Sequence, residues 1–146
     1  MKSILTIVLA MCCFASVSAQ TGNYANDLKS AEETIKKNVF KNNFKYLITY
    51  SEKTNASFSV SPKTEYRVYF VYDNTNHPVG KFKAYLMNPD KKIVAKYTAV
   101  PEDIGQIGVA RVQRLKFTTK DIGGKDTQPI KLEASPKATI YIFYKN

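Results

Sequence analysis

The chain has 146 residues, which supports one hydrophobic core and argues against a second domain. Hydrophobic residues make up 44% of it and aromatic residues 12%, including ten Tyr and eight Phe but no Trp. The formal net charge of +10 favours anionic partners, but the lysines are spread along the chain and form no run that would indicate a specific nucleic-acid site.

Residues 1–19 have the features of a secretory signal peptide. Lys2 precedes an apolar run at 4–15, and Val17 and Ala19 occupy the two positions that a signal peptidase inspects. The apolar run is shorter than a membrane-spanning helix requires. We therefore expect an exported protein, periplasmic or extracellular, whose mature chain begins at Gln20.

Cys12 and Cys13 allow an alternative, in which one of them is the lipidated first residue of a lipoprotein. This anchoring is disfavoured because Met11, which is not a small residue, precedes Cys12, and because the apolar segment would be very short. Cleavage after Ala19 removes both cysteines. The mature protein is then expected to have no disulfide and no cysteine-ligated metal, so its core alone must stabilise it.

The segment 20–43 is predicted to contain one short amphipathic helix at 27–40. Its apolar residues recur at spacings of three or four, as one stripe of a helix requires. These are Leu28, Ala31, Ile35 and Val39. Asn26 or Asp27 is the expected N-cap. We expect a lid or cap helix, and a flexible arm is the alternative.

After Asn43 the apolar residues recur at alternate positions, which is typical of β-strands. About eight such segments follow, at 44–50, 56–60, 65–73, 80–88, 91–99, 109–119, 129–134 and 138–145. Turn-like residues separate them at 61–63, 73–78, 88–90, 101–108, 123–124 and 135–137. Because no helices alternate with these segments, residues 44–146 are predicted to form an antiparallel, jelly-roll-like β-sandwich. The predicted fold class is therefore mainly β.

Alternation also predicts which strands are central. In the segment 80–88, Phe82, Ala84 and Leu86 share one face and the lysines share the other, so one face is expected to be wet. The segments 65–73 and 138–145 are apolar on both faces. We expect these two strands to lie inside the sheet.

Four sequence motifs carry a resemblance to a known family. They are YRVYFVYD, FKAYLMNPDKKIVAKY, RLKFTT and the terminal ATIYIFYK. From Asn55 to Lys145 the chain resembles the small secreted jelly-roll sandwiches of bacterial pre-peptidase C-terminal domains. The resemblance implies a role in secretion or in surface binding, and it supplies no catalytic residues.

His77, the only histidine, lies in the turn-like segment 73–78. A catalytic histidine needs a nucleophile or carboxylate within reach, and a zinc site needs two or three further ligands. Asp73 is the nearest acid along the chain, and no Gly-x-Ser-x-Gly elbow is present. We therefore predict a turn and a protein that is not an enzyme. The alternative is a small secreted hydrolase, or a hydrolase inhibitor, acting near His77.

Two loops offer oxygen atoms that calcium accepts. The sequence from Asp73 to Asn76 reads DNTN, and that from Asp121 to Asp126 reads DIGGKD. Each loop is better explained as a structural turn. We expect no cofactor and no metal site, with calcium as the only ion that the sequence suggests.

Aromatic side chains next to cations give the strongest indication of binding. Tyr69 and Tyr85 lie opposite the main apolar stripe of their strands, where an exposed ring stacks on a sugar or a base. The candidate binding residues are Tyr69, Tyr85, Asp73, Asn76 and His77. We predict a non-catalytic secreted binding or accessory module whose ligand is a glycan, an envelope polymer or a protein. A structural envelope subunit is a further alternative.

Overall fold

The computed structural model describes residues 22–76, 80–87, 93–97, 101–119 and 128–146. One helix precedes seven strands: α1 (Tyr24–Lys41), β1 (Lys45–Val60), β2 (Glu65–Asp73), β3 (Lys81–Met87), β4 (Ile93–Tyr97), β5 (Glu102–Ile107), β6 (Ala110–Thr118) and β7 (Gln128–Lys145). The strands form one antiparallel sheet in the order β4-β3-β7-β2-β6-β5, with β1 pairing β7. The prediction of a mainly β chain with an N-terminal helix is confirmed.

Helix α1 begins earlier than predicted. Its N-cap is Asn23, whose side-chain oxygen accepts a hydrogen bond from the backbone nitrogen of Ala25 at 3.1 Å. Asn26 and Asp27 lie inside the first turn, so the prediction that one of them caps the helix is wrong. Within the described part of the chain, no helix has the length and apolar character needed to cross a bilayer.

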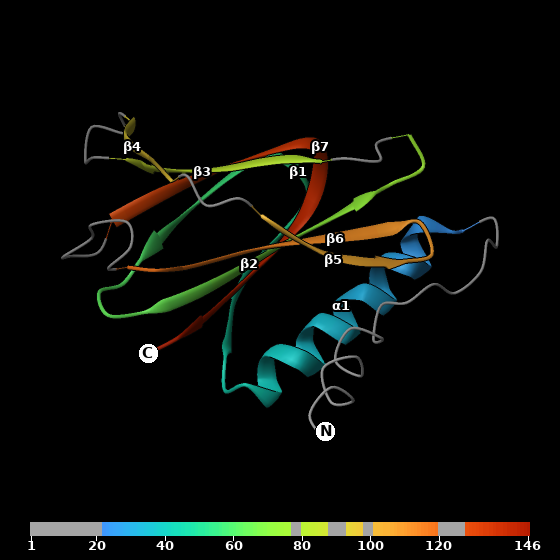
Figure 1. Cartoon of the computed structure of the whole chain (residues 1–146), viewed down its shortest axis with the longest axis horizontal. Coiled ribbons are helices and arrows are strands. Elements are labelled where there is room, and N and C mark those ends of the chain that lie inside the picture. The colour runs from blue at the N-terminus through green and yellow to red at the C-terminus, as the bar shows by residue number, and fades with distance from the viewer. Residues whose placement is uncertain (1–21, 77–79, 88–92, 98–100, 120–127) are drawn as a thin grey trace, which may run out of the picture.

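The apolar stripe of α1 packs against the sheet. Ala31, Ile35 and Val39 are buried there, as the spacing predicted. Figure 1 shows the helix lying along one face of the strands. It is therefore a cap on the sheet and not a free arm.

Two pairs of predicted strands are each one continuous strand. Strand β1 includes both 44–50 and 56–60 except Phe44, and β7 includes both 129–134 and 138–145. These two long strands pair with each other from Lys45 opposite Tyr144 to Val60 opposite Gln128. Register shifts in β1 absorb the polar residues that interrupt its alternation. The expected turn at 135–137 is part of β7.

Strand β7 holds the sheet together. Its first half pairs with β3, its second half pairs with β2, and β1 runs along its other edge. Figure 1 shows β7 curving strongly as it passes from one set of partners to the other. Thr139, Ile140, Tyr141 and Ile142 are all buried. The predicted interior positions of β2 and β7 are confirmed.

Residues 101–108, predicted to be a turn, contain strand β5. Its sequence lacks the apolar alternation that identifies a strand, because it is a polar edge strand. Cross-strand ion pairs join it to β6: Glu102 with Arg114, and Asp103 with Arg111. Pairing with β6 therefore decides its conformation.

The sheet has an apolar cluster on each face. One cluster draws side chains from β1, β2, β3, β6 and β7: Ala56, Phe58, Val60, Tyr66, Val68, Phe70, Tyr72, Phe82, Ala84, Leu115, Phe117, Ile130, Leu132, Ala134, Ala138, Ile140 and Ile142. The other lies under α1: Ala31, Ile35, Val39, Phe44, Tyr69, Val71, Ala110, Val112, Tyr141 and Phe143. The helix packs mainly against β2, β5 and β6. The candidate binding site described below lies on the outer face of β3.

Candidate functional site: a lysine-lined groove on the sheet

The outer face of β3 is wet, as its alternation predicted. Phe82 and Ala84 point into the core, which places Lys81, Lys83 and Tyr85 on the opposite side. Lys81 and Lys83 are exposed and Tyr85 is half-buried. The described side chains of β3 therefore present two cations and one aromatic ring outward.

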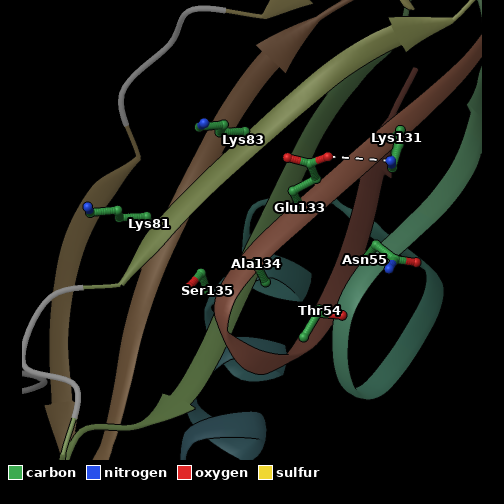
Figure 2. A pocket seen from close by; sticks show the side chains of 8 residues that line it. All are labelled: Thr54, Asn55, Lys81, Lys83, Lys131, Glu133, Ala134 and Ser135. Carbon is green, nitrogen blue, oxygen red and sulfur yellow. Dashed lines mark ion pairs between the residues drawn. The ribbon is translucent and has the colours of Figure 1, made fainter. Parts of the chain in front are cut away.

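The next strand adds to this face. On β7, Leu132 and Ala134 are buried in the core, and Lys131 and Glu133 are half-buried on the outer side. Lys131 Nζ lies 3.3 Å from Glu133 Oε1. Figure 2 shows Glu133 turned toward Lys131 across this ion pair. The pair is partly open to solvent and contributes little stability.

Strand pairing arranges these side chains in rows across three strands. Lys83 lies opposite Glu133, which lies opposite Asn55 of β1. The next row contains Tyr85, Lys131 and Ser57. Neighbouring strands are about 4.8 Å apart and successive rows about 6.8 Å apart. The side chains are thus spaced closely enough to contact one extended ligand.

The same face is hollowed. A groove of ≈ 300 Å³ is lined by Thr54, Asn55, Lys81, Lys83, Lys131, Glu133, Ala134 and Ser135 (Figure 2). A second hollow of ≈ 430 Å³ is lined by Tyr50, Lys53, Asn55, Ala56, Ser57 and Lys131. The two hollows adjoin, since both are lined by Asn55 and Lys131. We name them together the β3–β7–β1 groove.

The groove is cationic. Lys53, Lys81, Lys83 and Lys131 line it together with a single carboxylate, that of Glu133. Among the described residues, Lys81 and Lys83 form no ion pair, so their ammonium groups can pair with a ligand. The remaining polar lining consists of hydroxyl and amide groups, which donate and accept hydrogen bonds.

The two tyrosines predicted to bind have different environments. Tyr85 lies on the outer face, in register with Lys131 of the groove. Tyr69 is only 4% exposed, and its ring meets Phe143 edge to face at a centroid distance of 5.9 Å. The face of β2 that carries Tyr69 is covered, so Tyr69 has no free ring for stacking. The expectation of an exposed Tyr69 is wrong.

Asp73, the last residue of β2, and Asn76 do not line the groove; they line a neighbouring cavity with Pro136 and Lys137. Asp73 Oδ1 accepts hydrogen bonds from the backbone nitrogen of Thr75 at 2.9 Å and from its hydroxyl at 2.7 Å. This is an Asx turn, which agrees with the turn interpretation. Asn76 is exposed. His77 lies outside the described residues.

A polar cluster missed by the sequence analysis lies next to this turn. Glu52, Asp73, Asn76, Pro136 and Lys137 line a small cavity of ≈ 190 Å³. Glu52, with φ of 52°, occupies an irregular position in β1. Its carboxylate accepts hydrogen bonds from the hydroxyl of Tyr24 at 3.2 Å and from that of Thr139 at 3.3 Å.

The Glu52 carboxylate is already neutralised by protein groups. Lys137 Nζ lies 3.0 Å from Glu52 Oε2. Burial raises the pKa of Tyr24, and the negative charges of Glu52 and Asp73 raise it further, so this hydroxyl stays protonated as a donor. The cluster thus fastens the start of α1 to β1 and β7.

No group of three or more His, Cys, Asp or Glu side chains suited to a metal ion occurs in the described ranges. Asp73 uses one carboxylate oxygen for the Asx turn. The other loop considered for calcium, from Asp121 to Asp126, lies outside the described residues.

No protein family, curated protein or solved structure matches this chain.

Proposed function

We propose that the protein is a non-catalytic binding module that holds an acidic polysaccharide in the β3–β7–β1 groove. The observation that carries the proposal is that Lys53, Lys81, Lys83 and Lys131 line the groove together with a single carboxylate. Ammonium groups suit the carboxylate or sulfate groups of such a polymer. The ligand class follows from this charge and from the polar lining.

The shape of the groove favours a polymer over a small molecule. Sites for small ligands are enclosed and mainly apolar, and they bury most of the ligand surface. The β3–β7–β1 groove crosses three strands and is lined mainly by Lys, Thr, Asn and Ser side chains. An extended sugar chain can follow it from Lys81 to Lys53 and contact several rows of side chains.

Tyr85 supports the same ligand class. It stands beside Lys131 on the outer face, half-exposed. Aromatic rings bind the apolar faces of sugars, while neighbouring cations bind their acidic groups. The module would therefore recognise a charged sugar chain through both kinds of group.

The test is affinity for polygalacturonate, with neutral dextran as the comparison. We expect Lys83→Glu to weaken binding of polygalacturonate about fivefold or more, since an exposed ionic contact is worth about 1 kcal/mol. Binding should also weaken as salt is added, because salt screens exposed charges. Calorimetry or affinity electrophoresis measures both effects.

Lys29→Glu is the matched control, because Lys29 is exposed on α1 and its reversal changes the net charge equally. Equal loss of binding in both variants would refute the groove and leave only nonspecific attraction to a basic protein. Failure of the wild type to bind polygalacturonate, sulfated glycans or other acidic polysaccharides would refute the proposed ligand class.

Two finer features of the fold and its location belong to the same proposal. We propose that the curvature of β1 and β7 folds the sheet into a sandwich, since one apolar cluster includes Phe82 of β3 and Leu115 of β6, which lie far apart in the sheet order. We also propose export through residues 1–19, as the pattern around Lys2 and Ala19 indicates. Mass spectrometry of exported protein should find Gln20 as its first residue.

A further inference from the structure

Three exposed apolar side chains occur together at one end of the molecule. Phe40 is 49% exposed, Tyr46 is 48% exposed and Leu47 is 39% exposed. Among the large hydrophobic side chains whose exposure the structure describes, these three alone are exposed. Phe40 lies in the last turn of α1, and the other two lie at the start of β1, which leaves the helix end directly (Figure 1).

Contacts with a shared ring bring Phe40 and Tyr46 together. The ring of Phe143 in β7 meets Phe40 at a centroid distance of 6.1 Å and Tyr46 at 6.0 Å, both edge to face. Leu47 is the extra residue of a β-bulge, because the register passes from Tyr46 opposite Phe143 to Ile48 opposite Ile142. A bulge redirects a side chain away from the regular alternation. We name Phe40, Tyr46 and Leu47 the apolar patch.

Lysines adjoin the apolar patch along the chain. Lys37, Lys41 and Lys45 are exposed. The Lys36 ammonium lies 5.9 Å from the ring centroid of Tyr46, and the Lys45 ammonium lies 5.9 Å from that of Tyr144, its partner in β7. Lys36 also pairs with Glu32, one turn earlier on the helix. No Asp or Glu occurs in the sequence between Glu33 and Glu52. The sequence around the patch therefore carries a clear excess of positive charge.

The ends of β7 and β2 that lie nearby do not cancel this positive charge. Lys145 lies 5.8 Å from the ring centroid of Phe44, and Glu65 of β2 is opposite Lys145 in the sheet. The Arg67 guanidinium lies over the same ring, 4.1 Å from its centroid. The carboxylate of Glu65 thus has two cations near it, Lys145 and Arg67.

We propose that the apolar patch and its lysines dock the protein on the surface of an anionic lipid bilayer. Apolar and aromatic side chains enter the boundary between headgroups and acyl chains, and lysines bind the anionic headgroups. Tyrosine is enriched at this boundary because its ring is apolar and its hydroxyl is polar. The patch combines all three kinds of group over a short stretch of chain.

Charge complementarity selects this occupant. A second copy of the chain would bring Lys37, Lys41 and Lys45 against the same lysines, since a two-fold interface joins identical surfaces. A soluble polyanion would pair with the lysines but would leave Phe40 and Leu47 in water. An anionic bilayer satisfies both the charges and the apolar side chains.

The docking surface is separate from the β3–β7–β1 groove. The apolar patch uses Tyr46 and Leu47 at the start of β1, whereas the groove uses Tyr50 and residues 53–57 farther along the strand. The two surfaces have no lining residue in common. A failure of the polysaccharide test would therefore not refute bilayer binding, and the reverse also holds.

The experiment is cosedimentation of the mature chain, beginning at Gln20, with phosphatidylcholine vesicles, with and without phosphatidylglycerol. We expect binding only when phosphatidylglycerol is present. The variant Lys37→Glu, Lys41→Glu, Lys45→Glu should lose at least about fivefold in affinity for each lysine changed. The variant Phe40→Ser, Leu47→Ser should bind at least about tenfold more weakly, because its apolar side chains no longer enter the bilayer.

The matched control is Lys53→Glu, Lys81→Glu, Lys83→Glu, which makes the same change in net charge at the groove. It should retain more vesicle affinity than the triple variant of the patch. Equal losses, unchanged affinity of the Phe40→Ser, Leu47→Ser variant, or no binding of the wild type would each overturn the proposal. The single variant Lys41→Glu changes only one exposed side chain, so it keeps the test decisive if the multiple variants fail to fold.

Discussion

The carboxylate of Asp27 in α1 accepts a hydrogen bond from the backbone nitrogen of Val109, at 2.9 Å between Asp27 Oδ2 and the nitrogen. Val109 lies in the turn between β5 and β6. The preceding residue, Gly108, has φ of +56°, and a Cβ atom there would lie 2.1 Å from Asp27 Oδ2. This contact fastens the helix to a turn that is distant in sequence, and it requires glycine at position 108.

Asp27→Ala should therefore destabilise the fold by about 1–2 kcal/mol, since it leaves a partly buried N–H group without its acceptor. Asn26→Ala, at the exposed neighbouring position, is the control and should stay within about 0.5 kcal/mol of the wild type. Urea denaturation measures the difference. Equal midpoints for the two variants would show that the contact contributes nothing.

Gly108→Ala should also destabilise the protein, both through its positive φ and through collision with Asp27. The collision disappears in the Asp27→Ala background, whereas the backbone strain remains. A double-mutant cycle should therefore show a smaller cost of Gly108→Ala in that background. Simple additivity of the two costs would contradict the geometry.

The buried tyrosines Tyr24 and Tyr141 should make the protein less stable at alkaline pH. Burial raises the pKa of Tyr24 and of Tyr141, and nearby carboxylates, Glu52 and Glu32 respectively, raise it further. For both tyrosines the folded-state pKa lies above the ordinary value of 10.0. The free energy of unfolding that their neutral hydroxyls contribute is therefore fully present below pH 10 and is lost as pH rises through the folded-state pKa. Tyr24→Phe should have a flatter decline in unfolding free energy above pH 10, and adding Tyr141→Phe should flatten it again. Curves parallel to that of the wild type would contradict this.

Acid pH should affect Glu32. A hydrogen bond from Lys36 and one from the Tyr141 hydroxyl lower the pKa of Glu32 below its ordinary value of 4.5, although partial burial opposes them. The resulting stability is present above pH 4.5 and is lost as pH falls through the lower folded-state pKa. Glu32→Gln should flatten the acid limb of a stability curve measured by urea denaturation. Glu33→Gln makes the same chemical change at an exposed position, and an identical effect there would contradict the prediction.

Tyr72 should fix the chain where β3 begins. Its side chain is fully buried, and its hydroxyl oxygen accepts a hydrogen bond from the backbone nitrogen of Gly80 at 2.9 Å. Tyr72→Phe should cost about 1–3 kcal/mol, because it leaves a buried N–H group without a partner. Tyr85→Phe removes a hydroxyl from the half-exposed outer face and should cost less than about 0.5 kcal/mol. Thermal unfolding compares the two, and equal losses would refute this role.

Local alternation was sufficient to predict the interior strands. In β2, Val68 and Phe70 join the cluster shared with β3, while Tyr69 and Val71 join the cluster under α1. Apolar residues at every position require cover on both faces, so an interior place follows from the sequence. The same pattern also required cover over Tyr69, so the expectation that this ring is exposed was wrong; the covering element is α1.

The groove depended on information that no local pattern contains. Lys83, Glu133 and Asn55 come from three strands that are distant in sequence, and only the register of β3 and β1 on β7 brings them into one row. Alternation in β3 did predict that Lys81 and Lys83 share a solvent-exposed face. Their gathering with Lys131 and Lys53 follows from strand order, which alternation alone cannot predict.

The central place of β7 has a consequence for how the protein reaches its native state. Strands β1, β2 and β3 all pair with β7, which follows them in the chain. Until β7 emerges from the ribosome, those strands have no partner along the edges that it will occupy, and Phe58, Val68 and Phe82 lack part of their cover. Folding is thus postponed until synthesis of this region ends, and a holdase chaperone has the whole of that interval in which to bind the nascent chain.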